Sequence, residues 1–168
     1  MRNNTHFSQF IPPTTFHLKT GTWTHVAGAV AGTIATRKTA AAETTVVTIP
    51  IQIPSNSLPL QGSKLASIEI DFEFTVAAVT SMAAVINKVT RGADTLPAAV
   101  VAQTFTYDTG HDTAPERITQ DQHRMTLTIT NPFYIDNDEY VLVELTIVCG
   151  AAVVVDMLGA VANYTDKG

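Results

Sequence analysis

Apolar and polar residues alternate with a period of two along most of the chain. In residues 67–76 one parity is apolar and the other is polar: Ile68, Ile70, Phe72, Phe74 and Val76 against Glu69, Asp71, Glu73 and Thr75. Successive side chains of a β-strand point to opposite faces of the sheet. This stretch therefore predicts a strand with one buried face and one solvated face.

Similar patterns recur along the chain, and no long helical pattern competes with them. The predicted strands are residues 16–18, 23–36, 47–53, 64–76, 82–91, 100–107, 123–130, 140–149 and 153–164. Pro50 and Pro54 place the third of these at a sheet edge or beside a bulge, and Asn131-Pro132 is expected to end the seventh. About eight or nine strands at intervals of about ten residues indicate an all-β protein, an antiparallel β-sandwich of the jelly-roll type.

The first fifteen residues differ from the rest of the chain. They are mostly polar, and Pro12-Pro13 stiffens their end toward polyproline geometry. We expect an N-terminal arm at 1–15 and a single sandwich domain at 16–168. Phe7, Phe10 and Ile11 give the arm apolar anchors, which favours contact with a neighbouring subunit over a disordered tail.

The composition bears on possible partners. Charged residues make up 15% of the chain, against about 25% on average, and interface cores are depleted in charge. This favours self-association into a homo-oligomer or polymer, although any Thr-rich β-sandwich has a similar surface. The net charge of −5 and the scattered basic residues argue against direct binding of nucleic acid or anionic membrane.

Two further features concern the chain's environment. The N-terminus lacks the apolar core of a signal peptide, and the longest apolar stretch, residues 151–162, is too short to span a bilayer and contains Asp156. We therefore expect no membrane insertion. Cys149 is the single cysteine and lies in an apolar run, so we expect an inert buried thiol, no intrachain disulfide and no Cys-based zinc site.

Catalytic signatures are weak in this sequence. Ser67 and Ser81 lie in or beside strands without the glycine-flanked elbow of a serine hydrolase. Glycosidases need two carboxylates that face one cleft, whereas the acidic residues of 67–76 form a row on one strand and are more typical of a solvated face or an interface rim. We expect no enzymatic activity and no cofactor.

Two groups of residues could bind a cation. Asp136, Asp138 and Glu139 crowd one turn and could supply oxygen ligands to calcium, but acidic turns are also common because Asp tolerates turn geometry. His111 and Asp112 could join His123 in a transition-metal site, although a polar loop explains them equally well. We expect a solvated turn and a polar loop.

Aromatic residues and the longest polar insertion, residues 108–122, offer a carbohydrate-binding alternative. Aromatic rings could form a stacking platform for sugars or could pack in the core; the candidates are Phe16, Trp23, Tyr107, Phe133, Tyr134 and Tyr140. Core packing is the simpler expectation for an ordinary aromatic content.

The closing segment resembles the last hairpin of jelly-roll subunits. The residues concerned are Tyr140 to Ile147 and, after a short turn, Leu158 to Tyr164. Such subunits occur in virus capsids, phage fibre heads and trimeric C1q or tumour-necrosis-factor-like domains. The resemblance implies a homo-oligomeric structural role, in a virion or an extracellular assembly, and carries over no functional residue.

Three functions follow as hypotheses. The first is a non-catalytic structural subunit that assembles with copies of itself into a capsid, fibre, tube or filament. The second is a ligand-binding module, with carbohydrate as the candidate ligand. The third is a small jelly-roll enzyme, which is disfavoured because the clustered histidines of metal-dependent jelly rolls are missing.

Overall fold

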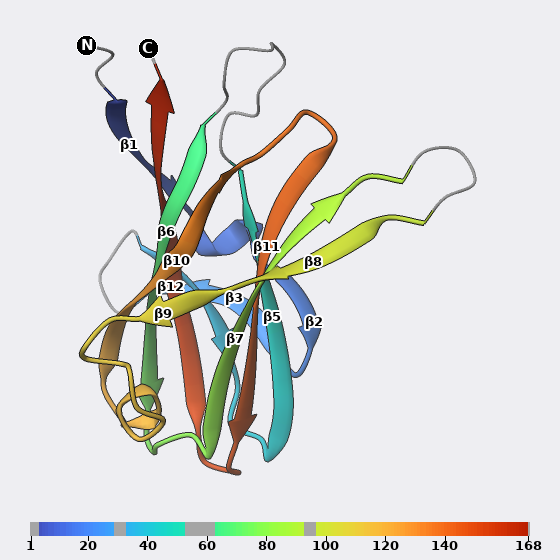
Figure 1. Cartoon of the computed structure of the whole chain (residues 1–168). Helices are drawn as coiled ribbons and strands as arrows, with labels where there is room; N and C mark the ends of the chain where they lie inside the picture. Colours follow the sequence, from blue (N-terminus) through green and yellow to red (C-terminus); the bar gives the residue numbers. More distant parts are fainter. Residues whose placement is uncertain (1–3, 29–32, 53–62, 93–96, 168) are drawn as a thin grey trace.

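Two antiparallel β-sheets pack face to face in the computed structural model, which describes residues 4–28, 33–52, 63–92 and 97–167 (Figure 1). Over these ranges the chain forms twelve strands and two short 3-10 turns, η1 (Pro13–Thr15) and η2 (Glu116–Ile118), and no α-helix. Accordingly, the described part of the chain contains no helix that is long and apolar enough to cross a membrane. The predicted all-β sandwich is confirmed.

The first sheet has seven strands. Its order is β3 (Trp23–Ala27), β4 (Ile34–Lys38), β12 (Val154–Lys167), β6 (Lys64–Thr75), β10 (Gln122–Tyr134) and β9 (Phe105–Tyr107), and β1 (Asn4–Ile11) pairs with β12. The second sheet has five strands. Its order is β2 (His17–Thr20), β5 (Glu43–Ile51), β11 (Glu139–Cys149), β7 (Ser81–Thr90) and β8 (Ala99–Gln103).

From β4 onward the chain alternates between the two sheets, either as single strands or as hairpins. The chain runs from β4 in the first sheet to β5 in the second, then to β6, to the β7–β8 hairpin, to the β9–β10 hairpin, to β11 and finally to β12. The resulting orders β4-β12-β6-β10 and β5-β11-β7-β8 interleave as in a jelly roll. β11 and β12 each have neighbours on both sides, as expected from their apolar sequences.

The structure contains more strands than the eight or nine expected, because two predicted strands are in fact pairs and residues 4–11 form the additional strand β1. Residues 23–36 form β3 and β4, which pair with each other; the expected alternation at Val30 and Gly32 lies outside the described residues. Residues 100–107 divide between β8 in the second sheet and β9 in the first, so the chain crosses between the sheets near Thr104. Sequence periodicity alone does not reveal such a crossing.

Two predicted strand ends also differ. β10 continues through Pro132 to Tyr134, with a register shift between Thr128 and Phe133 that accommodates the proline. Pro50 pairs only with Leu142 of β11, because β2 covers β5 no further than Thr48. β5 is therefore at the sheet edge only at this end, since its earlier residues lie between β2 and β11; Ile53 and Pro54 lie outside the described residues.

The predicted N-terminal arm outside the sandwich is wrong for the described residues. β1 pairs along its whole length with β12 of the same chain, and Ile11 is buried in the core. The Thr36 hydroxyl of β4 also donates to the carbonyl of Pro13 at 2.7 Å. Backbone pairing inside its own sheet satisfies this segment without a neighbouring subunit.

The core lies between the sheets and follows the predicted parity of β6. Ile68, Ile70, Phe72 and Phe74 are 0–1% exposed, and the polar residues between them reach the outer face. Val76 is the exception, because β6 ends at Thr75 and Val76 is 65% exposed with a φ of 74°.

Cys149 is buried at the end of β11, as expected. Burial raises the pKa of its thiol. The reactive thiolate is therefore disfavoured at this position.

Replacing Phe72 with alanine should remove a fully buried ring from the centre of the first sheet. We expect Phe72→Ala to lower the free energy of unfolding by about 3–5 kcal/mol, measured by urea denaturation. The exposed control Thr128→Ala should change stability by less than about 0.5 kcal/mol. Equal effects of the two substitutions would contradict the assigned register.

Candidate functional site

A row of polar side chains crosses the outer face of the first sheet. Gln122 of β10 is directly opposite Glu73 of β6, Glu73 is opposite Asp156 of β12, and Asp156 is opposite Arg37 of β4. The row follows from the alternation of β6: the register that buries Phe72 and Phe74 turns Glu73 outward. Side chains opposite one another on neighbouring strands are close enough to interact.

Arg37 holds Asp156 in place within this row. Its Nε donates to Asp156 Oδ1 at 2.7 Å and its Nη2 donates to Oδ2 at 2.6 Å, so the contact is bidentate. The Asp156 side chain is only 7% exposed. The hydrogen bonds that Arg37 donates to Asp156 raise the pKa of the Arg37 guanidinium, and the charge of Glu73 adds to the effect.

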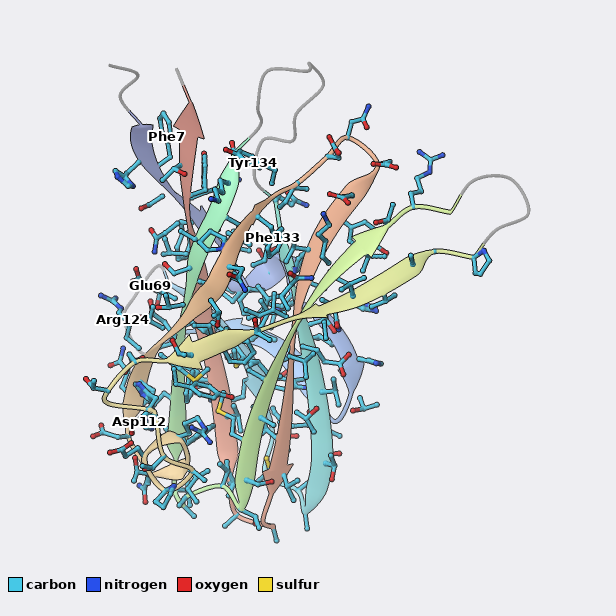
Figure 2. All side chains as sticks on the ribbon, in the orientation of Figure 1. Phe7, Glu69, Asp112, Arg124, Phe133 and Tyr134 are labelled. Atoms are coloured by element: carbon cyan, nitrogen blue, oxygen red, sulfur yellow. The ribbon has the colours of Figure 1, made fainter. Side chains whose placement is uncertain are left out.

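A second ion pair lies one row further along the sheet. Arg124 Nε of β10 donates to Asp71 Oδ1 of β6 at 2.8 Å, and these two residues are also directly opposite each other. Beyond them, Asn163 Nδ2 donates to Glu69 Oε1 at 2.7 Å. Figure 2 shows Glu69 and Arg124 along this side of the sandwich. Most polar groups of the face therefore hold one another in fixed positions.

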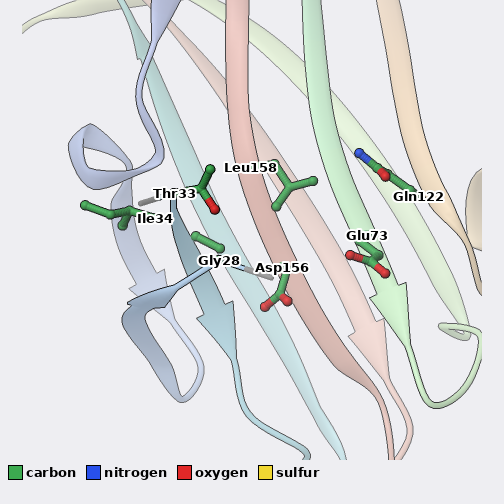
Figure 3. A pocket seen from close by; sticks show the side chains of 8 residues that line it. Gly28, Thr33, Ile34, Glu73, Gln122, Asp156 and Leu158 are labelled. Carbon is green, nitrogen blue, oxygen red and sulfur yellow. The ribbon is translucent and has the colours of Figure 1, made fainter. Parts of the chain in front are cut away.

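Glu73 and Gln122 are the exceptions. Within the described ranges neither side chain makes a hydrogen bond, and Glu73 interacts with Arg37 only through its charge. Both side chains line a hollow of about 240 Å³ on the outer face (Figure 3). A carboxylate and an amide are thus available to a ligand.

Three adjoining hollows form an elongated depression, which we call the transverse groove. The central hollow contains Glu73 and shares Gln122 with a second hollow beside Asp71 and Arg124. It shares Leu158 and Ile34 with a third hollow. The transverse groove therefore runs across the strands of the first sheet, from β10 over β6 and β12 to β4 and the end of β1.

The end of the transverse groove at β1 is apolar. Phe10 is 58% exposed and Ile34 is 51% exposed. Leu158 lines the same hollow and lies at a register shift in β12. Gly159 follows with a φ of 147°, and a Cβ there would come 2.7 Å from the Phe10 ring. Glycine at 159 thus lets the ring lie close to the sheet.

The acidic residues of the turn at 136–139 do not converge on one point. Glu139 pairs with Lys88 at 2.7 Å and accepts a hydrogen bond from the backbone N–H of Asp136, while Asp138 is exposed. Among the described residues no group of three or more His, Cys, Asp or Glu side chains could hold a metal ion. The calcium candidates Asp136, Asp138 and Glu139 are therefore not brought together.

The histidines of the candidate transition-metal site do meet. His111 and His123 form a hydrogen bond of 3.1 Å, but Asp112 is exposed and Asp108 contacts His111 instead. The insertion 108–122 contributes only its last residue, Gln122, to the central hollow.

The aromatic candidates do not gather into a platform. Phe16 is buried and Tyr107 lies under the Arg117 guanidinium. Trp23 donates a hydrogen bond to the carbonyl of Thr20. Tyr134 and Tyr140 are exposed but lie on β10 and β11, in different sheets. Phe10, proposed as an interface anchor, is the exposed ring beside the groove.

The predicted interface residues have different outcomes. Ile11 is buried in its own core and is not available to a neighbour. Phe7 stacks on Tyr164 with ring centroids 5.6 Å apart and stays 42% exposed. An interface through Phe7 and Phe10 stays a prediction.

Sequence reasoning found the acidic row of β6 but assigned it to a solvated face or an interface rim. Asp156 had a usable signal, because it is a lone charge in an apolar run. Arg37, Gln122 and Leu158 had none, since only the pairing of β6 with β10 and β12, and of β12 with β4, places them near Glu73.

Comparison with known proteins gives only distant structural likenesses. No protein-family model matches the sequence, and a search of curated proteins gives no match. Among solved structures, an arabinose-bound GH51 α-L-arabinofuranosidase is similar over 92% of this chain and 24% of its own length, with 10% identity and a TM-score of 0.45. A family 11 carbohydrate-binding module from Clostridium thermocellum, in complex with a mixed-linked tetrasaccharide, is similar over 99% and 89%, with 9% identity and a TM-score of 0.28.

The bidentate pair should contribute to stability. Arg37→Met leaves the buried Asp156 carboxylate without its partner, and we expect a loss of about 2 kcal/mol in the free energy of unfolding, below the 3–5 kcal/mol of fully buried pairs because Arg37 is 38% exposed. Arg124→Met is the matched control, because Arg124 is 71% exposed, and it should cost much less. A larger loss for the control in urea denaturation would contradict this account.

Proposed function

We propose that this protein is a non-catalytic carbohydrate-binding β-sandwich and that the transverse groove binds a neutral oligosaccharide. The observation that carries the proposal is the unengaged pair Glu73 and Gln122 at the centre of a groove whose other polar groups hold one another. A carboxylate accepts hydrogen bonds and an amide both donates and accepts. This combination matches the hydroxyl groups of a sugar.

The apolar end supports the same proposal. A sugar ring carries hydroxyl groups at its rim and C–H groups on its faces, so it needs polar and apolar contacts side by side. Phe10, Ile34 and Leu158 supply apolar surface next to the polar row. Binding sites typically combine apolar walls with a few placed polar groups.

The charge of the groove favours a neutral ligand. Asp71 and Asp156 are each paired with a guanidinium, and Glu69 accepts a hydrogen bond from Asn163. Glu73 is left as the one carboxylate of the central hollow without an ion pair among the described residues. A cationic ligand would therefore find only this single unpaired negative charge to attract it in the central hollow.

The length of the groove favours a chain of several sugars. Its three hollows adjoin across the sheet, and strands hold the polar groups at fixed positions. A rigid site loses little conformational freedom on binding. Several weak contacts along the groove would then sum to a measurable binding free energy.

Calorimetry with cellohexaose, xylohexaose and mannohexaose tests this proposal. At least one should bind, and Glu73→Ala or Gln122→Ala should weaken that binding roughly tenfold, as expected for one or two lost hydrogen bonds. Thr146→Ala on the outer face of the second sheet is the control and should bind like the unmodified protein.

A cationic peptide provides the result that would contradict the proposal. Hexalysine, assayed in parallel, should bind weakly and lose affinity in high salt. If hexalysine binds in a Glu73-dependent manner and none of the three sugars binds, the groove is a site for cationic peptides and the proposal is wrong.

A second candidate function is self-association, favoured by one specific observation. β8 is the last strand of the second sheet, and its residues Ala99–Gln103 include no charged side chain. Val100 and Val101 are 60% and 56% exposed. Edge strands usually carry charges or prolines that prevent pairing with another chain. We propose that a second copy pairs with this edge.

Light scattering after size exclusion tests the second candidate. The unmodified protein should run as a dimer or larger species at about 100 μM, since interfaces of this kind are weak. Val101→Lys should shift it to the monomer, whereas Thr128→Lys, on an exposed position of the other sheet, should not. A monomer in all three cases would exclude pairing through β8.

A further inference from the structure

A chain of buried and partly buried hydrogen bonds runs behind one end of the transverse groove. Asp108 Oδ1 lies 2.8 Å from His111 Nδ1, His111 Nε2 lies 3.1 Å from His123 Nδ1, and His123 Nε2 lies 3.0 Å from the carbonyl oxygen of Thr119. The two histidines are 8% and 7% exposed. The chain therefore has two buried imidazoles between two oxygen atoms.

The number of protons in this chain follows from its ends. A carboxylate and a carbonyl can only accept hydrogen bonds, so the three contacts need three N–H protons. Two neutral imidazoles carry two protons between them, one on each ring. All three hydrogen bonds can form together only if the His111–His123 pair carries one additional proton.

Asp108 is suited to balance the resulting positive charge. Burial alone raises the pKa of its carboxyl, but hydrogen bonds from the N–H groups of Thr126, His111 and Gly110 outweigh burial, and the pKa lies below its ordinary value. Asp108 is therefore a carboxylate throughout the range in which histidine side chains titrate. Only below that range would loss of its charge break the chain.

Few other charged groups face the pair. On η2, Glu116 binds the backbone N–H of Thr113 and Arg117 donates to the carbonyl of His111 at 2.6 Å. β6 presents the rings of Phe72, stacked on His123 at 4.9 Å, and Phe74. Asp112 and Asp121 of the insertion are exposed, and Asp71 of β6 pairs with Arg124 on the outer face.

The chain connects to the groove through the residues before β10. The Thr119 carbonyl receives the last hydrogen bond, the Asp121 carbonyl accepts from the N–H of Phe74 at 3.0 Å, and Gln122 begins β10 and lines the groove. If the pair loses its additional proton, one of the three contacts must be lost. The Thr119 hydroxyl, 3.5 Å from His123 Nε2, could then turn toward that nitrogen.

We propose that the additional proton on the His111–His123 pair fastens residues 108–121 against the sheet and so holds Gln122 in position for binding. Ligand binding at the groove, which rests on the function proposed above, then weakens when this additional proton is lost. The proton count itself does not depend on any ligand.

Nitrogen-15 NMR of the histidine rings tests the proton count without a ligand. At pH 5.5 the two rings together should show three protonated nitrogens, and one should be lost by pH 8.5. Over the same range the exchange protection of the Phe74 amide should fall in the unmodified protein and in the control His17→Gln. In His123→Gln the exchange protection of the Phe74 amide should be low and independent of pH.

Two further measurements separate this proposal from its alternatives. Thr119→Val removes the alternative hydroxyl donor, so it should behave like the unmodified protein at pH 5.5 and lose more Phe74 protection at pH 8.5. Affinity for cellohexaose, xylohexaose or mannohexaose, whichever binds, should be about fivefold weaker at pH 8.5, the low end of typical coupling between sites. His17→Gln should show the same change.

Two neutral rings with one N–H proton each at pH 5.5 would overturn the proposal. Protection of the Phe74 amide that does not depend on pH in the unmodified protein would also overturn it. Both measurements are made on the unmodified protein without a bound sugar, so they do not depend on whether a variant folds. The proposal can therefore fail while the groove binds sugars, and it can hold when none of the three sugars binds.

Discussion

The register of β6 against its two neighbours is the constraint on which the rest of the structure depends. Residue for residue, it places Phe72 opposite His123 and Met157 in the core and Glu73 opposite Gln122 and Asp156 outside. A shift of one residue would exchange the two faces and bury the carboxylates. Burial of the apolar parity therefore also assembles the transverse groove.

The two sides of β10 link the groove to the buried histidines. Gln122 and Arg124 point to the outer face, while His123 between them points inward and meets His111 of the insertion. An event at the buried ring is thus one residue away from the ligand-binding face. This alternation explains how a loop that contributes a single side chain to the central hollow could still control it.

The fold class was predictable because alternation along single strands is a local property. The outward direction of Glu73 and the burial of Phe72 were visible in residues 67–76 alone. The site was not predictable, because Arg37, Asp156 and Gln122 come from three separate strands and meet Glu73 only through long-range pairing. The N-terminal strand was missed for the same reason: its partner, β12, lies at the other end of the chain.

Mapping of amide chemical shifts during titration with cellohexaose, xylohexaose and mannohexaose tests the central claim most directly. We predict that the largest changes for a bound sugar lie at Glu73, Gln122 and Leu158, with smaller changes toward Phe10. The amides of β5 and β7, in the opposite sheet, should not move. Changes concentrated on that sheet, or none with any of the three sugars, would contradict the assignment of the transverse groove as a carbohydrate site.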